Sequence, residues 1–172
     1  MGKKLLILGA GGHGQVVAEA AEDCGYTEIA FLDDNSEMAI GKISEADQFK
    51  ELYSDAFVGI GNNQLRSDLI DTLRNIGFHV PVIIHPSAYV SKSAKIEEGT
   101  IVEPKAIVNA HSVVGEGSII SVGSIVDHDV KIGRCCHVNS GAIIKAGAKI
   151  DNHQKLEAGE VVLGYEAAVV KK

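Results

Sequence analysis

The chain has no tryptophan, and aromatic residues make up only 5% of its 172 positions. A core with so few rings must be built from aliphatic and small side chains such as Val, Ile and Ala. The three cysteines are Cys24, Cys135 and Cys136, and their spacing excludes a zinc site of the usual type. Because no secretion signal is recognisable, we expect reduced thiols that serve packing.

The chain also lacks an excess of basic residues and a long apolar run. Its formal net charge of −7 argues against a nucleic-acid-binding surface. The apolar run from Leu5 to Leu8 is too short for a signal peptide, and no stretch approaches the ~20 apolar residues of a membrane span. We therefore expect a cytoplasmic protein with no membrane span and no nucleic-acid partner.

What the second half does contain is a strict six-residue period. Small residues precede most of its aliphatic positions by two, and glycine often follows by three, as at Gly99 and Gly117. The aliphatic positions are Val90, Ile96, Val102, Val108, Val114, Ile120, Val126, Ile132, Val138, Ile144, Ile150, Leu156 and Val162. A hexapeptide period is typical of the left-handed parallel β-helix, in which three hexads form one triangular coil. The alternative is a flat sheet with chance repetition, and the unbroken register argues against it.

Residues 1–84 lack this period and instead alternate between apolar strands and helical segments. We expect strands over 5–8, 29–32, 56–60 and 80–84, with helices after the first strand, near 44–53 and over 64–76. A βαβαβαβ order implies a small parallel sheet, equivalent to half of a Rossmann domain. Because the pattern changes near residue 85, the sequence predicts an α/β unit over 1–84 and a β-helix over 85–172.

A glycine-rich loop joins the first strand to the first helix. Gly9, Gly11 and Gly14 match the G-x-G-x-x-G pattern, and Asp33 ends the second strand 19 residues later. Glycines let a phosphate approach the helix N-terminus, where the helix dipole favours negative charge. Half of a Rossmann domain suits a nucleotide diphosphate better than a dinucleotide, and His13 lies within reach of a phosphate or a sugar. The alternatives are a tight turn without a ligand and an NAD-dependent oxidoreductase, which would need a second nucleotide-binding half.

Three further stretches are typical of one protein family. They are Phe31-Leu32-Asp33-Asp34, then Ile60-Gly61-Asn62-Asn63 with Arg66 following, and Val126 to Gly133 followed by His137-Val138 and Gly141-Ala142. A short G-A-G-G-H-G domain ahead of a hexapeptide β-helix resembles the bacterial sugar acetyltransferases of the sialic-acid O-acetyltransferase and UDP-amino-sugar N-acetyltransferase types. The resemblance spans nearly the whole chain. It implies a nucleotide-sugar-binding domain over 1–84 and an acyltransferase domain over 85–172.

The resemblance also implies roles for individual residues. In that family the α/β domain holds a UDP-linked sugar, and the β-helices hold acetyl-CoA in the groove between subunits of a trimer. His128 is then the general base, Asp129 the carboxylate that orients it, and His137 a contact of acetyl-CoA near the acetyl carbonyl. The residues that this resemblance assigns to the UDP-sugar are Gly11, Gly12, His13, Asp33, Asp34 and Gly61.

The 18-residue coil adds expectations of its own. Positions 18 apart stack on one edge, so Asp129 lies above His111 and below Gly147, while His128 lies below Ala146. We expect a backbone N–H near Ala146 or Gly147 to face the oxyanion formed from acetyl-CoA, and His111 to support Asp129. Because the column of Asp129 holds no second histidine beside His111, we expect no metal.

The two histidines assigned to the reaction lie far apart within one chain. His128 and His137 are nine positions apart, which is one and a half hexads, and therefore fall on different parts of the triangle. One acetyl group can meet both side chains only if a neighbouring chain supplies one of them. This spacing independently favours a homotrimer with active sites between its subunits.

The last hexads depart from the family pattern. Residues 152–157 are polar, and the sequence lacks the further coils and the Gly-Val-Pro-Ala-like turn of the family. We expect residues 165–170 to cap the open end of the solenoid, and we expect weaker acetyl-CoA binding because the additional coils normally contact it.

The leading interpretation is an acetyl-CoA-dependent acetyltransferase that acts on a UDP-amino-sugar. Two alternatives stay open. One is an O-acetyltransferase of a free sugar such as sialic acid, or an enzyme with a different acyl donor. The other is a non-catalytic trimer that only binds a nucleotide-sugar.

Overall fold

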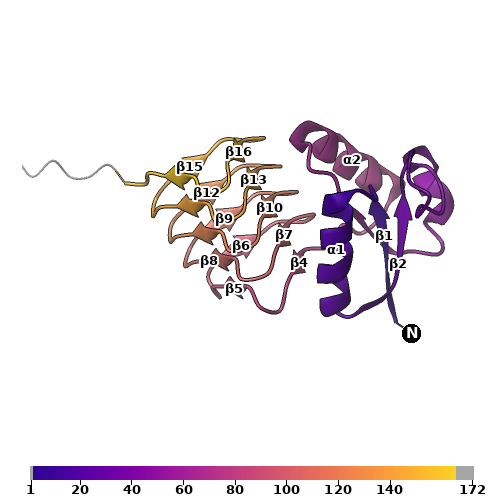
Figure 1. Ribbon diagram of the computed structural model, residues 1–172, viewed down its shortest axis with the longest axis horizontal. Coiled ribbons are helices and arrows are strands. Elements are labelled where there is room, and N and C mark those ends of the chain that lie inside the picture. Colours follow the sequence, from indigo (N-terminus) through magenta and orange to yellow (C-terminus); the bar gives the residue numbers. More distant parts are fainter. Residues whose placement is uncertain (1, 166–172) are drawn as a thin grey trace, which may run out of the picture.

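The computed structural model describes residues 2–165 and places an α/β unit beside a β-helix (Figure 1). Apart from Tyr165, the capping segment expected over 165–170 lies outside the described residues. Within residues 2–165, no helix is both long and apolar enough to cross a membrane.

The α/β unit is built around a parallel sheet of three strands in the order β2-β1-β3. Its elements are β1 (Lys3–Leu8), α1 (Gly12–Asp23), β2 (Tyr26–Leu32), the 3₁₀ helix η1 (Ile43–Phe49), β3 (Asp55–Val58) and α2 (Asn63–Ile76). The central strand β1 is fully buried from Leu5 to Leu8, as a strand covered on both faces requires. The carboxyl ends of β1 and β3 lead into the glycine loop and α2, so candidate ligand-binding groups gather at this edge.

The prediction that residues 80–84 form a fourth strand of this sheet is wrong. Beyond β3, the part of the sheet formed by residues 2–165 is extended only by an isolated bridge between Asp55 and His79. Pro81 follows, and it has no N–H to donate to a sheet. Ile83 and Ile84 instead form β4, which pairs with β7 (Ile101–Val102) of the β-helix. The division of the chain into 1–84 and 85–172 stays a prediction.

From β4 onward the chain forms a parallel β-helix of two-residue strands. After β4 (Ile83–Ile84) come β5 (Tyr89–Val90), β6 (Lys95–Ile96), β7 (Ile101–Val102), β8 (Ile107–Val108), β9 (Val113–Val114), β10 (Ile119–Ile120), β11 (Ile125–Val126), β12 (Lys131–Ile132), β13 (His137–Val138), β14 (Ile143–Ile144), β15 (Lys149–Ile150), β16 (Lys155–Leu156) and β17 (Val161–Val162). They form three sheets, in the orders β16-β13-β10-β7-β4, β17-β14-β11-β8-β5 and β15-β12-β9-β6. Paired residues lie one coil apart, as Ile119 with His137 and Val126 with Ile144. The structure therefore confirms the hexapeptide β-helix.

From Gly99 to Gly159, the corners of the β-helix have a left-handed backbone conformation at one position per hexad. Gly fills many of these positions without strain. Two of the others hold His111 (φ 59°) and Asp129 (φ 58°). Lys105, Cys135 and His153 share this conformation, so it does not by itself assign a function to a side chain.

The three outward faces of the β-helix differ in character. The first, on β4, β7 and β10, is covered by the α/β unit, where Ile83, Ile101 and Ile119 join the core around α1. The second, which we call the apolar face, is only partly buried and consists of Tyr89, Ile107, Ile125, Ile143 and Val161. The third, which we call the lysine face, consists of Lys95, Val113, Lys131 and Lys149.

A buried arginine on α2 joins the two parts of the molecule. Arg66 is 1% exposed, and its Nε donates to the carbonyl of Gly117 at 2.6 Å. Nη2 donates to the carbonyls of Cys135 and Cys136, at 3.1 and 3.2 Å. The remaining hydrogen bonds go to the carbonyls of Ile60 and Gly61 and to Oδ1 of Asn63. One guanidinium thus fixes the loop before α2 against two coils of the β-helix.

Substitution of this arginine tests how strongly the two parts depend on it. We expect Arg66→Leu to lower the free energy of unfolding by at least about 3 kcal/mol, because several buried carbonyls lose their hydrogen-bond donor. The control is Arg74→Leu, also on α2, whose half-exposed guanidinium pairs with Glu116 and Asp71. This change should cost about 1 kcal/mol or less. Urea unfolding measures the stability of both variants. Equal losses in the free energy of unfolding would contradict the role of Arg66 in joining the two parts.

Candidate active site

The predicted base and its carboxylate form a pair at the corner between β11 and β12. Nδ1 of His128 lies 2.7 Å from Oδ2 of Asp129, and both side chains are about half exposed in the single chain. Two backbone N–H groups fix the corner by their hydrogen bonds. The N–H of Asp129 donates to the carbonyl of Ala110 at 2.9 Å, and the N–H of His128 donates to Oδ1 of Asp127 at 2.8 Å. With Nδ1–H donating to Asp129, Nε2 of His128 is the nitrogen that is available to accept a proton.

The electrostatics of this pair suit a general base. The hydrogen bond to Asp129 raises the pKa of His128, and the same bond lowers the pKa of Asp129. A more basic imidazole takes up a proton from a nucleophile more readily.

Tyr165 is a third member of this corner, and the sequence predicted it only as part of the capping segment. Its hydroxyl donates to Oδ2 of Asp129 at 3.3 Å, two coils away along the chain. The ring crosses directly over Gly147, where any side chain would collide with it. His111, which we expected to support Asp129, forms no hydrogen bond to it within residues 2–165. Its charge makes only a small contribution to lowering the pKa of Asp129.

Of the two backbone amides expected near the oxyanion, only one is available. The N–H of Gly147 already donates to the carbonyl of His128 at 3.1 Å. The N–H of Ala146 has no hydrogen-bond partner among residues 2–165. Ala146 stacks on His128, one coil further along. The geometry therefore favours Ala146 over Gly147 as the oxyanion donor, and Gly147 provides the space for Tyr165.

The glycine loop has two kinds of glycine. Gly9 has φ 102°, and a side chain on Gly14 would collide with the carbonyl of Gly9, so the fold itself requires both. In contrast, a Cβ on Gly11, Gly12 or Gly61 would meet nothing within 4 Å. Packing does not explain these three glycines, and the open space beside them is what a phosphate or sugar would need.

The two aspartates predicted to bind the sugar nucleotide are partly used within the protein. Oδ2 of Asp33 accepts from the N–H of Ala10 at 2.8 Å, and Oδ1 accepts from the N–H of Asn35 at 2.9 Å. These bonds lower the pKa of Asp33. Oδ1 of Asp34 accepts a longer bond from the N–H of Ile43 at 3.3 Å. Asp33 therefore holds the glycine loop in shape at the place where a ligand would lie.

The fold brings the glycine loop against the β-helix at a second cluster of titratable groups. The rings of His13 and His137 lie 6.5 Å apart between centroids. Nε2 of His137 is 3.2 Å from the hydroxyl of Ser121, and Nδ1 of His13 is 3.8 Å from Oε1 of Glu103. Nε2 of His13 and Nδ1 of His137 are buried and have no hydrogen-bond partner within the described chain. Each of these nitrogens needs a hydrogen-bond partner, which a ligand bound at this cluster could supply.

Both rings of this cluster are uncharged at neutral pH. Burial is the first cause that lowers the pKa of His13 and of His137 to about 4, and the nearby cation of Arg66 is the second. Burial also raises the pKa of Glu103. Sequence reasoning missed Glu103 and Ser121. The coil arithmetic places them in one column, but no local pattern indicates that the α/β unit covers this corner.

The structure does not bring all predicted site residues together. His137 lies on β13, in the sheet that faces the α/β unit, whereas His128 lies at the corner between the other two sheets (Figure 1). The two assigned clusters are therefore His128–Asp129 with Ala146, and His13–His137 with Glu103. Among residues 2–165, no three His, Cys, Asp or Glu side chains lie close enough together to hold a metal ion.

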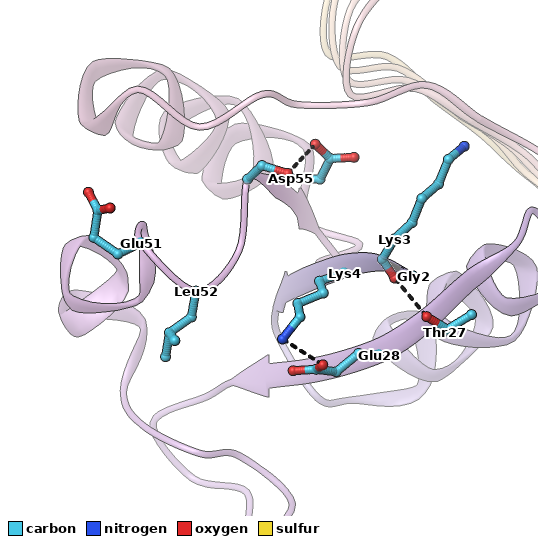
Figure 2. Close-up of a pocket in the computed structure, with 9 residues that line it drawn as sticks. Gly2, Lys3, Lys4, Thr27, Glu28, Glu51, Leu52 and Asp55 are labelled. Carbon is cyan, nitrogen blue, oxygen red and sulfur yellow. Dashed lines mark hydrogen bonds and ion pairs between the residues drawn. The ribbon is translucent and has the colours of Figure 1, made fainter.

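A hollow of about 490 Å³ lies elsewhere, at the amino-terminal edge of the three-stranded sheet. Figure 2 shows one ion pair among its charged groups, with Nζ of Lys4 2.7 Å from Oε2 of Glu28. It contains none of the residues in the two clusters. It also lies at the opposite end of β1 from the glycine loop, so we do not assign it to the reaction.

Comparison with known proteins links both halves of the chain to one group. The PglD N-terminal domain family matches residues 4–73. UDP-N-acetylbacillosamine N-acetyltransferase from Bacillus subtilis (strain 168) is 35% identical over 109 residues, which are 58% of this chain. The match spans only half of that curated relative.

Solved structures cover nearly the whole chain. One is the acetyltransferase domain of PglB from Neisseria gonorrhoeae FA1090, in complex with acetyl coenzyme A. It is 36% identical to this chain with a TM-score of 0.88, and the match covers 94% of this chain and 82% of the PglB chain. A mutant of GDP-perosamine N-acetyltransferase from Caulobacter crescentus, in complex with CoA and GDP-perosamine, is 30% identical with a TM-score of 0.86. The match covers 94% of this chain and 89% of the Caulobacter crescentus chain. These likenesses confirm the predicted fold class.

The titration of individual histidines tests the electrostatic description. We expect His13 and His137 to stay neutral down to about pH 4, because burial and Arg66 disfavour their charged forms, and His128 to titrate above the usual range. An unfolded chain protonates His13 and His137 near pH 6.5, so their burial should cost stability as the pH is lowered from about 6.5 to about 4. NMR of the imidazole nitrogens measures each pKa. A pKa near 6.5 for His13 or His137 would contradict the burial of this cluster.

Proposed function

The chain belongs to the family of bacterial sugar acetyltransferases built on hexapeptide repeats, and from this premise we propose that it transfers the acetyl group of acetyl-CoA to the amino group of a UDP-linked amino-sugar. The observation that carries the proposal is the His128–Asp129 pair, a base held by a carboxylate on a strained corner of the β-helix. We place the reaction in the cytoplasm, where acetyl-CoA and nucleotide-sugars are supplied.

The proposed chemistry uses the free nitrogen of His128. Nε2 accepts a proton from the acceptor amine as the amine nitrogen attacks the thioester carbonyl. The negative charge that develops on the carbonyl oxygen faces the N–H of Ala146. When the C–S bond breaks, the proton on His128 passes to the departing CoA sulfur, which leaves the amide and free CoA. Asp129 keeps Nδ1 protonated throughout, so that Nε2 always points toward the reacting groups.

The nucleotide part of the substrate fits the edge of the three-stranded sheet. The open space over Gly11, Gly12 and Gly61 suits the diphosphate, and the N-terminus of α1 favours its negative charge. Asp33 and Asp34 lie beside the loop, where we assign them to the nucleoside. His13 then points from the loop toward the β-helix, and the sugar follows it to His137. His137 is assigned to acetyl-CoA near the acetyl carbonyl.

A trimer accounts for the character of the apolar face. Five aliphatic or aromatic positions in one column, partly exposed in the single chain, form a stripe that solvent disfavours. The neighbouring lysine face has the same geometry but a charged character, so the apolar column is not a general property of β-helix surfaces. We therefore propose that three copies bury their apolar faces around a common axis.

This arrangement also resolves the distance between the two clusters. The apolar face lies between two corners: one carries His128 and Asp129, and the other carries Ser121 and Glu103 beside His137. Around a threefold axis, the first corner of each copy lies against the second corner of the next. The base of one subunit then meets the sugar and acetyl sites of its neighbour. Neither corner forms a complete site alone.

Release of CoA thiol tests the proposed function. We expect wild type to release thiol from acetyl-CoA with a UDP-amino-sugar, and His128→Ala to be slower by at least about 100-fold because the general base is lost. His79→Ala is the matched control, since His79 pairs with Asp55 at the surface of the α/β unit, away from both clusters. It should retain wild-type activity.

The panel for this assay also includes GDP-amino-sugars and free sialic acid. Release with sialic acid alone would support the O-acetyltransferase instead. If folded protein releases no thiol from acetyl-CoA with any acceptor, this result would contradict the proposed transferase activity and favour a binding role.

A further inference from the structure

Two glutamates of the β-helix make the same backbone hydrogen bond in different surroundings. Oε2 of Glu97 accepts from the N–H of Glu116 at 3.0 Å, and Oε2 of Glu103 accepts from the N–H of Val122 at 2.9 Å. In both cases the bond reaches 19 residues along the chain and ties one coil to the next. Glu97 is exposed, whereas Glu103 is only 7% exposed. This bond therefore does not by itself require burial, and the burial of Glu103 needs another explanation.

The second oxygen of Glu103 has no hydrogen-bond donor among the described residues. Oε1 lies 3.8 Å from Nδ1 of His13, which is too far for a hydrogen bond. His13 is also neutral at the pH of the cell, because burial and Arg66 lower its pKa to about 4. Arg66 itself is committed to carbonyl oxygens and Asn63. A carboxylate that is buried without a counter-charge is costly, and burial accordingly raises the pKa of Glu103.

The groups around Glu103 describe the ligand that would relieve this cost. Nε2 of His13 and Nδ1 of His137 are buried without partners, and the hydroxyl of Ser121 lies beside His137. Two neutral imidazoles, a hydroxyl and one carboxylate make a polar site with a single negative charge. Such a site favours a ligand with one positive charge and several hydrogen-bonding groups. It adjoins the glycine loop, where the nucleotide of the substrate is assigned.

We propose that Glu103 binds the ammonium group of the amino-sugar acceptor and thereby makes the enzyme select amines over hydroxyls. This proposal rests on the proposed function, and it identifies the side chain that distinguishes N-acetylation from O-acetylation at that site. Glu103 acts in recognition. The ammonium form binds at Glu103 and then releases one proton to solvent. The neutral amine that remains attacks acetyl-CoA, and its second proton passes through Nε2 of His128 to the CoA sulfur.

Direct binding without acetyl-CoA separates this proposal from catalysis. Calorimetry would compare UDP-linked 2-amino and 4-amino sugars with the UDP-sugars that carry a hydroxyl at the same carbon. Wild type should bind one amine at least about 10-fold more tightly than its hydroxyl counterpart, as expected for a hydrogen bond to a charged group. Glu103→Gln should lose this preference, because the amide still accepts from Val122 but carries no charge. UDP alone should bind both proteins equally, which shows that Glu103→Gln is folded.

Glu97→Gln is the matched control, because it changes the same kind of hydrogen bond at a corner away from His13. It should keep the wild-type preference for the amine. A preference that survives in Glu103→Gln, or that is absent from wild type while UDP-sugars bind, would overturn the role of Glu103 alone. Failure of wild type to bind any nucleotide-sugar would overturn the proposed function as well.

Discussion

The structure depends on the buried cation of Arg66, which has no carboxylate partner among residues 2–165. The guanidinium of Arg66 is surrounded by carbonyl oxygens from the loop before α2 and from two coils of the β-helix. Carbonyl dipoles can satisfy a buried arginine only when several are fixed in the right directions, so the two parts of the chain must meet in one arrangement. The same charge acts on the site, because it disfavours protonation of His13 and His137. Burial is the larger cause of the neutral state of both histidines, and the contact that assembles the fold adds to it.

The β-helix contributes geometry that a globular fold would have to build from several loops. Its repeat places every sixth residue at an equivalent point, so a corner can carry Asp129 while the interior keeps an unbroken aliphatic column. The three outward faces then differ in surface: the first is covered by the α/β unit, the second is apolar, and the third carries lysines. The corners on either side of the apolar face carry the two halves of the proposed site. Division of a site between corners explains why the single chain shows two clusters and no complete active site.

The sequence predicts much of this structure, and the misses have physical causes. The six-residue period predicts the β-helix because each inward side chain must be small or aliphatic wherever it lies. The run from Val80 to Ile84 suggests a strand of the first sheet, but apolar character does not determine which strand it pairs with, and β4 pairs with β7. The family motif includes Arg66, yet only the structure shows that its side chain is buried among carbonyls. The 18-residue coil places Glu103 in one column with Ser121, and Tyr165 in one column with Asp129. No spacing shows that the α/β unit covers Glu103 or that the hydroxyl of Tyr165 reaches Asp129. The roles assigned to His128, Asp129 and His137 stay predictions.

The central claim is that one acetyl-transfer site is shared between two subunits, and mixing two inactive variants tests it most directly. His128→Ala chains and His137→Ala chains would be refolded together in equal amounts, and thiol release would be compared with each variant refolded alone. In randomly mixed trimers, about a quarter of the sites combine an intact His137 from one subunit with an intact His128 from the next. The account predicts that about this fraction of wild-type activity returns. A mixture no more active than its components would show that the two histidines act within one chain or not at all, and it would contradict the account.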